Sequence, residues 1–360
     1  MHPAPVPLPL ADGSPRRPPL VSPRAILIAL VAVLAGGLLG AAGFAAERRL
    51  AGPDLDVRRT PTGWRVTAEG GLRFHGPDLH GRHLVWQDGP FVLFIDLDSG
   101  RLRTLAPGPE NGATWRPAVS GEYVVWFEAP RGAWRGDAYS YDFASGRRRL
   151  VAEEVLVASY PDVSGPTAVW TESVEDGATQ LTVTDLASGQ HRSLAVPDGE
   201  PLVDGRLVAY RRRPSASSRD EIVGIDLDTG GQTLIASAAP GSALGITGWA
   251  VSRRRVAWCW KDWSTGEDRV LVRDVDTLQT VPVATGAGLV GPSLDGDLVV
   301  WAEPMSGGTR IMGLRLGGED REIAATELTV SHVLVSGEFV AWMGEDSAGR
   351  SVLEVVESPL

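Results

Sequence analysis

The sequence contains one cysteine, Cys259, and one lysine, Lys261. A single thiol excludes an internal disulfide, so packing and hydrogen bonds must hold the fold together. The Gly-x-x-x-x-Gly-Lys phosphate-binding loop does not occur, and neither do the Gly-x-Ser-x-Gly and His-Glu-x-x-His hydrolase motifs. Because no contiguous catalytic signature is present, we expect no catalytic residue, no cofactor, no bound metal and no enzymatic activity.

Positive charge is also scarce. The formal net charge is −11, and removing residues 1–24, which carry three arginines and one aspartate, leaves −13. A nucleic-acid partner requires a basic surface. The composition therefore excludes nucleic acid as a partner.

Charge is absent from residues 25–46. At about 1.5 Å per residue, this run is long enough to cross the apolar part of a bilayer as a helix. We interpret it as a single transmembrane helix that anchors the chain; a cleaved signal peptide is the alternative. Residues 1–24 hold eight prolines and predict a disordered tail. Residues 47–63 are polar and contain proline and glycine, which predicts a linker.

A phrase that recurs through the rest of the chain is seen in Pro117-Ala-Val-Ser-Gly-Glu-Tyr-Val-Val-Trp126. It predicts a short strand, a tight turn at Gly121 and a second strand that ends in an aromatic residue. Six copies keep the glycine, and a seventh has Arg253 in its place. The aromatic residues are Trp86, Trp126, Trp170, Tyr210, Trp258, Trp301 and Trp342. Their spacing is 40 to 48 residues, the period of a four-stranded propeller blade.

Most copies have a second half, in which a strand ends in an aspartate and a turn follows, as in Ile95-Asp-Leu-Asp-Ser-Gly100. The aspartate caps its turn, and the glycine supplies the positive φ of a tight hairpin. The chain is therefore predicted to be all-β, with a seven-bladed β-propeller of four-stranded blades over residues 64–360. The last copy lacks a fourth strand, while Trp64 to Ala68 has no unit of its own. We predict that this segment pairs with Val352 to Val356, as the outer strand of the last blade, and closes the ring.

These repeats, P-x-V-S-G-x-x-V-V-W followed by D-L-x-S-G, resemble the tandem repeats of TolB-like surface β-propellers over roughly residues 70 to 356. The chain differs from TolB itself, whose repeat usually has W-S-P-D-G where Val-Ser-Gly stands here. No partner of TolB is therefore carried over. The resemblance implies a surface location, so we expect a single-pass protein of the cell membrane with its propeller in the extracytoplasmic cell envelope.

The sequence suggests two kinds of site. Aromatic residues outside the repeat positions suit a protein, peptide or glycan partner, although several could instead plug the channel; the candidates are Trp115, Trp134, Tyr160, Trp249, Trp260 and Trp263. Histidines 75, 80 and 83 with Asp78 could bind a metal, but we expect exposed turn residues. The favoured function is a membrane-tethered binding or scaffold module. The alternative is a propeller lyase or hydrolase with a carboxylate site at the channel mouth.

Overall fold

The computed structural model describes residues 55–69, 74–108, 112–130, 132–133, 135–174, 178–196, 199–212, 220–239 and 241–360. The predicted tail, the predicted membrane helix and the first part of the predicted linker lie outside these ranges. In the described residues no helix has the length and apolar character needed to span a membrane. Strands and turns make up the regular structure there.

The described strands form seven antiparallel sheets, each of which is one propeller blade. Blade 1 contains β3 (Phe74–His80), β4 (His83–Asp88), β5 (Phe91–Asp96) and β6 (Arg101–Ala106). Blade 2 contains β7 (Gly112–Val119), β8 (Tyr123–Pro130), β9 (Arg135–Asp142) and β10 (Arg147–Leu156). Blade 3 contains β11 (Asp162–Ser164), β12 (Thr167–Ser173), β13 (Thr179–Asp185) and β14 (His191–Val196).

Blades 4 to 6 continue the same order, from an inner to an outer strand. Blade 4 contains β15 (Gly199–Asp204), β16 (Leu207–Arg212), β17 (Glu221–Asp226) and β18 (Gln232–Ser237). Blade 5 contains β19 (Leu244–Ser252), β20 (Arg255–Asp262), β21 (Glu267–Asp274) and β22 (Thr280–Ala287). Blade 6 contains β23 (Val290–Asp295), β24 (Leu298–Met305), β25 (Gly308–Arg315) and β26 (Asp320–Thr326).

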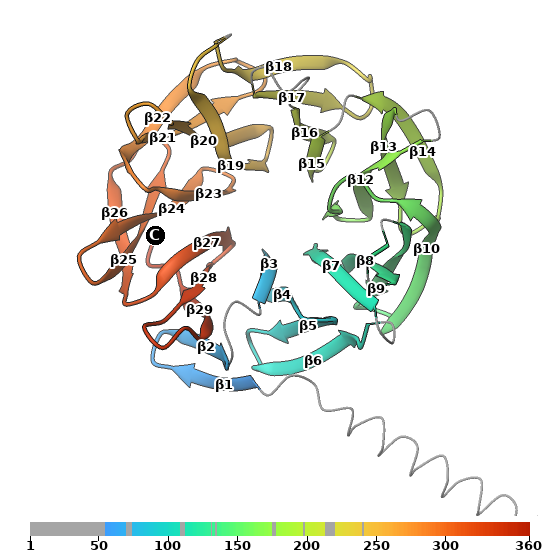
Figure 1. Cartoon of the computed structure of the whole chain (residues 1–360), viewed down its shortest axis with the longest axis horizontal. Helices are drawn as coiled ribbons and strands as arrows, with labels where there is room; N and C mark the ends of the chain where they lie inside the picture. The colour runs from blue at the N-terminus through green and yellow to red at the C-terminus, as the bar shows by residue number, and fades with distance from the viewer. Residues whose placement is uncertain are drawn as a thin grey trace, which may run out of the picture. The chain divides into compact units, whose positions relative to one another are not determined.

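Blade 7 joins the two ends of the propeller. Its strand order is β27 (Thr329–Ser336), β28 (Phe339–Glu345), β29 (Ser351–Glu357), β2 (Gly63–Ala68) and β1 (Leu55–Thr60). Inner strands of successive blades contact one another, and β27 contacts β3, so the ring is complete. Figure 1 shows these strands around the centre, with β1 and β2 next to β29. The prediction of an all-β, seven-bladed propeller is confirmed.

Ring closure follows the predicted pairing but with an extra strand. Trp64 lies opposite Val355, and Ala68 lies opposite Ser351, which confirms the predicted contact with the C-terminal strand. The predicted outer position is wrong, because β1 folds back along β2 and becomes the outermost strand. Residues 55–60 thus form a strand where we expected a linker. The apolar Leu55 and Val57 pack against the core there, which accounts for the difference.

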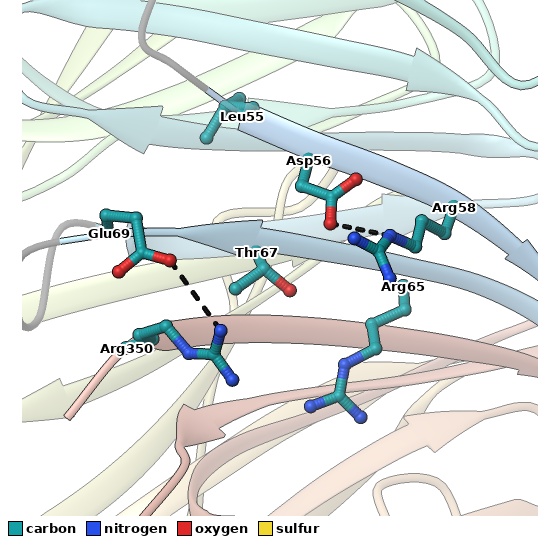
Figure 2. Close-up of a pocket in the computed structure, with 7 residues that line it drawn as sticks. All are labelled: Leu55, Asp56, Arg58, Arg65, Thr67, Glu69 and Arg350. Atoms are coloured by element: carbon teal, nitrogen blue, oxygen red, sulfur yellow. Dashed lines mark ion pairs between the residues drawn. The ribbon is translucent and has the colours of Figure 1, made fainter. Parts of the chain in front are cut away.

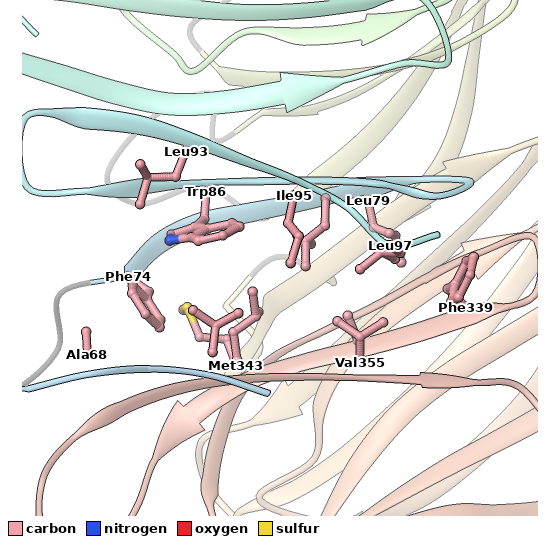
Figure 3. Packing of buried hydrophobic residues seen from close by; sticks show 14 residues of the cluster. Ala68, Phe74, Leu79, Trp86, Leu93, Ile95, Leu97, Phe339, Met343 and Val355 are labelled. Carbon is pink, nitrogen blue, oxygen red and sulfur yellow. The ribbon is translucent and has the colours of Figure 1, made fainter. Parts of the chain in front are cut away.

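The junction between blades 7 and 1 contains a cluster of buried apolar side chains from both blades. Trp86, Leu93 and Ile95 of blade 1 lie against Met343 and Val355 of blade 7, and all five are buried (Figure 3). The other repeat aromatics occupy the same position in their own blades and are also buried. Burial of apolar surface contributes about 25 cal/mol per Å². Packing between neighbouring blades is therefore the main stabilising term, as the recurring aromatic predicts.

Candidate functional site: the two ends of the central channel

The central channel is a cavity of about 880 Å³, lined mainly by residues of the seven inner strands and the turns that flank them. In each blade the inner strand leads to the turn that carries the repeat glycine, or Arg253 in blade 5. Because these strands run in the same direction, residues at equal distance from that turn form a ring. The reference position in each blade is the turn glycine, or Arg253 in blade 5. The seven residues that precede this position by one in the sequence are called the turn ring. The seven residues that precede it by five are called the mouth ring.

The turn ring joins each blade to the next. The Gly81, Gly205 and Gly296 N–H groups donate to Ser336, Ser164 and Ser252 Oγ at 2.8, 2.9 and 2.9 Å. In blades 7 and 5, the Gly337 N–H donates to Asp295 Oδ2 at 2.6 Å, and the Arg253 N–H donates to Asp204 Oδ2. Between blades 2 and 3, Ser120 Oγ donates to the Gly165 carbonyl at 3.0 Å. The serine of the Val-Ser-Gly phrase is therefore a link between blades, and this end of the channel is structural.

Two carboxyl groups lie midway along the channel wall. Asp78 accepts a hydrogen bond from the Val119 N–H at 2.6 Å, and Asp162 accepts one from the Val203 N–H at 2.5 Å. Burial, and to a smaller extent the nearby Asp78 carboxylate, raise the pKa of Asp162 to about 8. Burial also raises the pKa of Asp78. At neutral pH, Asp162 therefore carries a proton for much of the time.

The mouth ring differs from blade to blade. Its members are Gly76, Arg116, Tyr160, Glu200, Gly248, Gly291 and His332. Three consecutive blades thus carry a cation, an aromatic ring and an acid at this position, whereas the three glycines project no side chain. In six of the seven blades the turn ring holds a serine or aspartate, because that residue makes the contact between blades; blade 1 has His80 there. The mouth ring has no such uniform requirement, which makes it the candidate binding site.

Arg116 is held in a defined place at this mouth. Its guanidinium carbon lies 4.5 Å from the centroid of the Tyr160 ring, a cation–π contact. Its side chain also crosses Gly76, where a Cβ would lie only 2.2 Å from Arg116 Cγ. Within the described part of the chain, Arg116 forms no ion pair with a carboxylate.

Next to this pair stands His332. Its burial, together with the positive charges of Arg116 and His75, lowers its pKa to about 4. The imidazole is therefore neutral at physiological pH, and the Arg116 guanidinium adds a positive charge beside it. Its Nδ1 lies 3.1 Å from Ser331 Oγ.

A second cation–aromatic pair lies between blades 4 and 5. The guanidinium carbon of Arg211 is 5.3 Å from the centroid of Trp249, and its Nη2 bonds the buried Asp220 carboxylate at 3.1 Å. Asp220 also accepts the Ile246 N–H at 2.8 Å. The charge of Arg211 is therefore neutralised within the wall, unlike that of Arg116.

The sequence candidates fall in different places. Tyr160 and Trp249 line the channel, and Trp263 is 64% exposed beside Lys261, on the turn after β20. Trp115 and Trp249 lie within inner strands, where we expected connections between blades. The interpretation of Trp260 as a loop residue is wrong: β20 continues to Asp262, and Trp260 is buried in the core.

Trp134 lies outside the described residues. The sequence search missed Arg116, Glu200, Arg211 and His332. A comparison of the seven copies at the mouth position would have found three of them. The described residues contain no group of three histidine, cysteine, aspartate or glutamate side chains that could hold a metal ion.

A separate hollow of about 570 Å³ lies on the outer strands of blade 7 (Figure 2). Arg58 pairs with Asp56 at 2.6 Å, and Arg350 pairs with Glu69 at 3.6 Å. Arg65, which also lines the hollow, pairs across to Glu354 of β29 at 2.6 Å. These charges neutralise one another, so we assign the hollow to ion pairing within the closing sheet.

No protein-family model and no curated protein matches the sequence. Solved structures do match the fold. The β-propeller domain of the Trilobed protease from Pyrococcus furiosus aligns with 12% identity, over 80% of this chain and 96% of that one, with a TM-score of 0.60. An oligogalacturonate lyase in complex with manganese aligns with 11% identity, over 85% and 97%, with a TM-score of 0.57. TolB from Acinetobacter baumannii aligns with 14% identity, over 76% and 79%, with a TM-score of 0.46.

These similarities correct one expectation. We expected no enzymatic role, but the fold is shared with an oligogalacturonate lyase and with the propeller domain of a protease. A propeller assembles a site from several blades, so its residues need not form a contiguous motif. The absence of hydrolase motifs therefore does not exclude catalysis.

Proposed function

We propose that this protein is a propeller tethered to the membrane by residues 25–46, with the propeller outside the cell, and that it binds a partner at the mouth ring. The mixture of exposed aromatic and charged groups at the mouth ring carries this proposal. Tyr160 is 41% exposed there, between Arg116 and Glu200 in the ring. Aromatic and arginine side chains dominate the binding energy of many interfaces. Because a propeller of this fold occurs in the mitotic checkpoint complex, the architecture suits a protein or peptide partner.

The binding test compares two substitutions of similarly exposed apolar side chains. The full chain would be immobilised in detergent and offered envelope proteins and a glycan array. Tyr160→Ser should lose the captured partner, whereas Leu150→Ser, on outer strand β10 and 47% exposed, should retain it. Equal retention by both variants would place the binding surface elsewhere. Fractionation tests the tether: the intact chain should remain in the membrane pellet, and a soluble product that begins near Ala46 would refute the anchor.

A second candidate function is catalysis in the channel. The observation that favours it is the pair of carboxyl groups at Asp78 and Asp162, because a carboxyl group with a pKa of about 8 can donate a proton at neutral pH. The fold is also that of an oligogalacturonate lyase. Incubation with oligogalacturonate, followed by ultraviolet absorbance of an unsaturated product, tests this candidate. Asp162→Asn should abolish any such activity, and Asp295→Asn in the turn ring should preserve it.

A further inference from the structure

The Arg116 side chain has the features of an anion-binding group. Of the other arginines that line the channel, Arg211 bonds Asp220, whereas Arg253, at the turn end, forms no side-chain ion pair among the described residues. Arg116 is exposed and has no such partner among the described residues. A guanidinium group presents five N–H donors in a planar fork that matches a carboxylate.

The surrounding residues hold Arg116 in place before any ligand arrives. The Tyr160 ring lies under the guanidinium at 4.5 Å. Gly76 provides the space that the side chain crosses, with a positive φ of 49° and a bulge in β3 between His75 and Asp78. A side chain that is already positioned loses less conformational entropy on binding, which favours affinity.

The same corner carries the positive charge of Arg116. This guanidinium lies close enough to His332 to oppose its protonation. An anion between Arg116 and His332 would be attracted by this field. This positive charge is a local feature, because the chain as a whole has a net charge of −11. A polyanionic polymer would be repelled more strongly by that overall charge than a ligand with one carboxylate.

Two blades further along the mouth ring from Arg116, Glu200 has the opposite charge. In the mouth ring Tyr160 stands between Arg116 of blade 2 and Glu200 of blade 4. A peptide end combines a terminal carboxylate with side chains and amide groups a few ångströms away. A carboxylate on Arg116, an apolar contact on Tyr160 and a basic group near Glu200 would use all three blades.

We propose that the corner formed by Arg116, Tyr160, Gly76 and His332 binds the free C-terminal carboxylate of a peptide, and that Glu200 favours a basic side chain close to that end. This inference rests on the proposed function, since it names the ligand of the same mouth. An acidic glycan is the competing ligand, and the experiment below distinguishes the two.

The experiment uses two pools of short degenerate peptides that are identical except at the C-terminus, which is free in one and amidated in the other. The full chain, immobilised in detergent, is incubated with both pools and with oligogalacturonate, and bound material is identified by mass spectrometry. We expect the free-acid pool to be enriched about tenfold or more over the amide pool, as is typical of charge-assisted hydrogen bonds. Basic residues should be over-represented near the C-terminus of the bound peptides.

Variants connect the binding to individual residues. Arg116→Gln should reduce the enrichment to near unity, Arg116→Lys should retain part of it, and Glu200→Gln should remove the preference for basic residues. Arg101→Gln, on outer strand β6, is the control for the loss of one exposed arginine and should bind as the parent chain does. Thermal melts of every variant exclude unfolding as the cause of a loss.

Two results would overturn the inference. One is equal binding of the acid and amide pools, and the other is binding of oligogalacturonate, but not of peptides, that depends on Arg116. If partner capture depends on Tyr160 but is indifferent to Arg116 and to the C-terminal carboxylate, the inference alone fails. If capture is also indifferent to Tyr160, the proposed function fails with it.

Discussion

Replacement of Trp64 by alanine tests the closure of the ring. Trp64 lies on β2, from the N-terminal part of the chain, and its Nε1 donates to the Leu97 carbonyl of blade 1 at 2.7 Å. Its ring edge fills the space over Gly100, where a Cβ would lie 2.0 Å from the indole. The side chain therefore connects the closing strand of blade 7 with the turn of blade 1. Removing it should weaken the junction that joins the two ends of the propeller.

The expected cost follows from these contacts. Replacing a fully buried tryptophan by alanine costs about 3–5 kcal/mol, and Trp64 is half-buried, so lost packing accounts for about 2 kcal/mol. The lost hydrogen bond adds about 1 kcal/mol. A total of about 3 kcal/mol lowers the Tm of a domain of this size by about 6 °C. Thermal melts of the full chain, followed by circular dichroism, measure the shift.

The matched control is Trp263→Ala, because Trp263 is 64% exposed and lies on a turn of blade 5. A surface substitution of this kind usually changes stability by about 0.5 kcal/mol or less. Equal Tm shifts for the two variants would mean that the β2 contact with blade 1 does not stabilise the ring, and the closure argument would fail.

Three further predictions address the channel. Asp162 has a folded pKa of about 8, above its unfolded value of 3.8, so the stability linked to its proton is complete below 3.8 and is lost progressively as pH rises from 3.8 to about 8. Asp162→Asn, whose amide oxygen can still accept the Val203 N–H, should reduce this loss in melts across that pH range, and an unchanged profile would refute the assignment. Ser336→Ala removes the acceptor of the Gly81 N–H between blades 7 and 1 and should cost about 1–2 kcal/mol in urea unfolding, whereas Ser188→Ala on an exposed turn should cost less. Arg116→Gln removes a positive charge beside His332, so the histidine pKa should rise from about 4 in an NMR titration; a constant value would show that the two side chains do not interact.

The sequence predicted the propeller because the fold repeats. Each blade needs the same buried aromatic and the same turn, so Trp126 and its equivalents recur at a period that points to one architecture. Closure was predictable for a similar reason. The last unit lacks a fourth strand and the N-terminal strand belongs to no unit, so pairing of the two completes the last blade. The β1 strand was not predictable by this reasoning, since it belongs to no repeat. It forms because Leu55 and Val57 reach an apolar surface that exists only after the ring has closed.

The candidate site was harder to predict, for a geometric reason. Arg116 and His332 are more than two hundred positions apart in the sequence, and only closure of the ring brings blades 2 and 7 to the same channel. Aromatic residues expected in loops were the predicted candidates. Trp260 was one of them, but β20 is longer than expected and buries it, whereas charged residues of the site lie inside the inner strands.

The two ends of the inner strands have different tasks. At the turn end of six blades, a serine or aspartate one position before the turn bonds the backbone of the neighbouring blade, so a shared contact sets the residue type there; His80 of blade 1 is the exception. At the mouth end no contact is shared by all junctions: a Cβ at Gly248 would lie 2.4 Å from the Gly291 carbonyl oxygen, so glycine is needed there, whereas Arg116 stands at the same position in blade 2. A residue that the fold does not require, in a place where it has no carboxylate partner among the described residues, is available to recognise a ligand. The mouth-ring position, where the seven copies differ, therefore indicates the candidate site. The aromatic position, where the copies are alike, indicates the core.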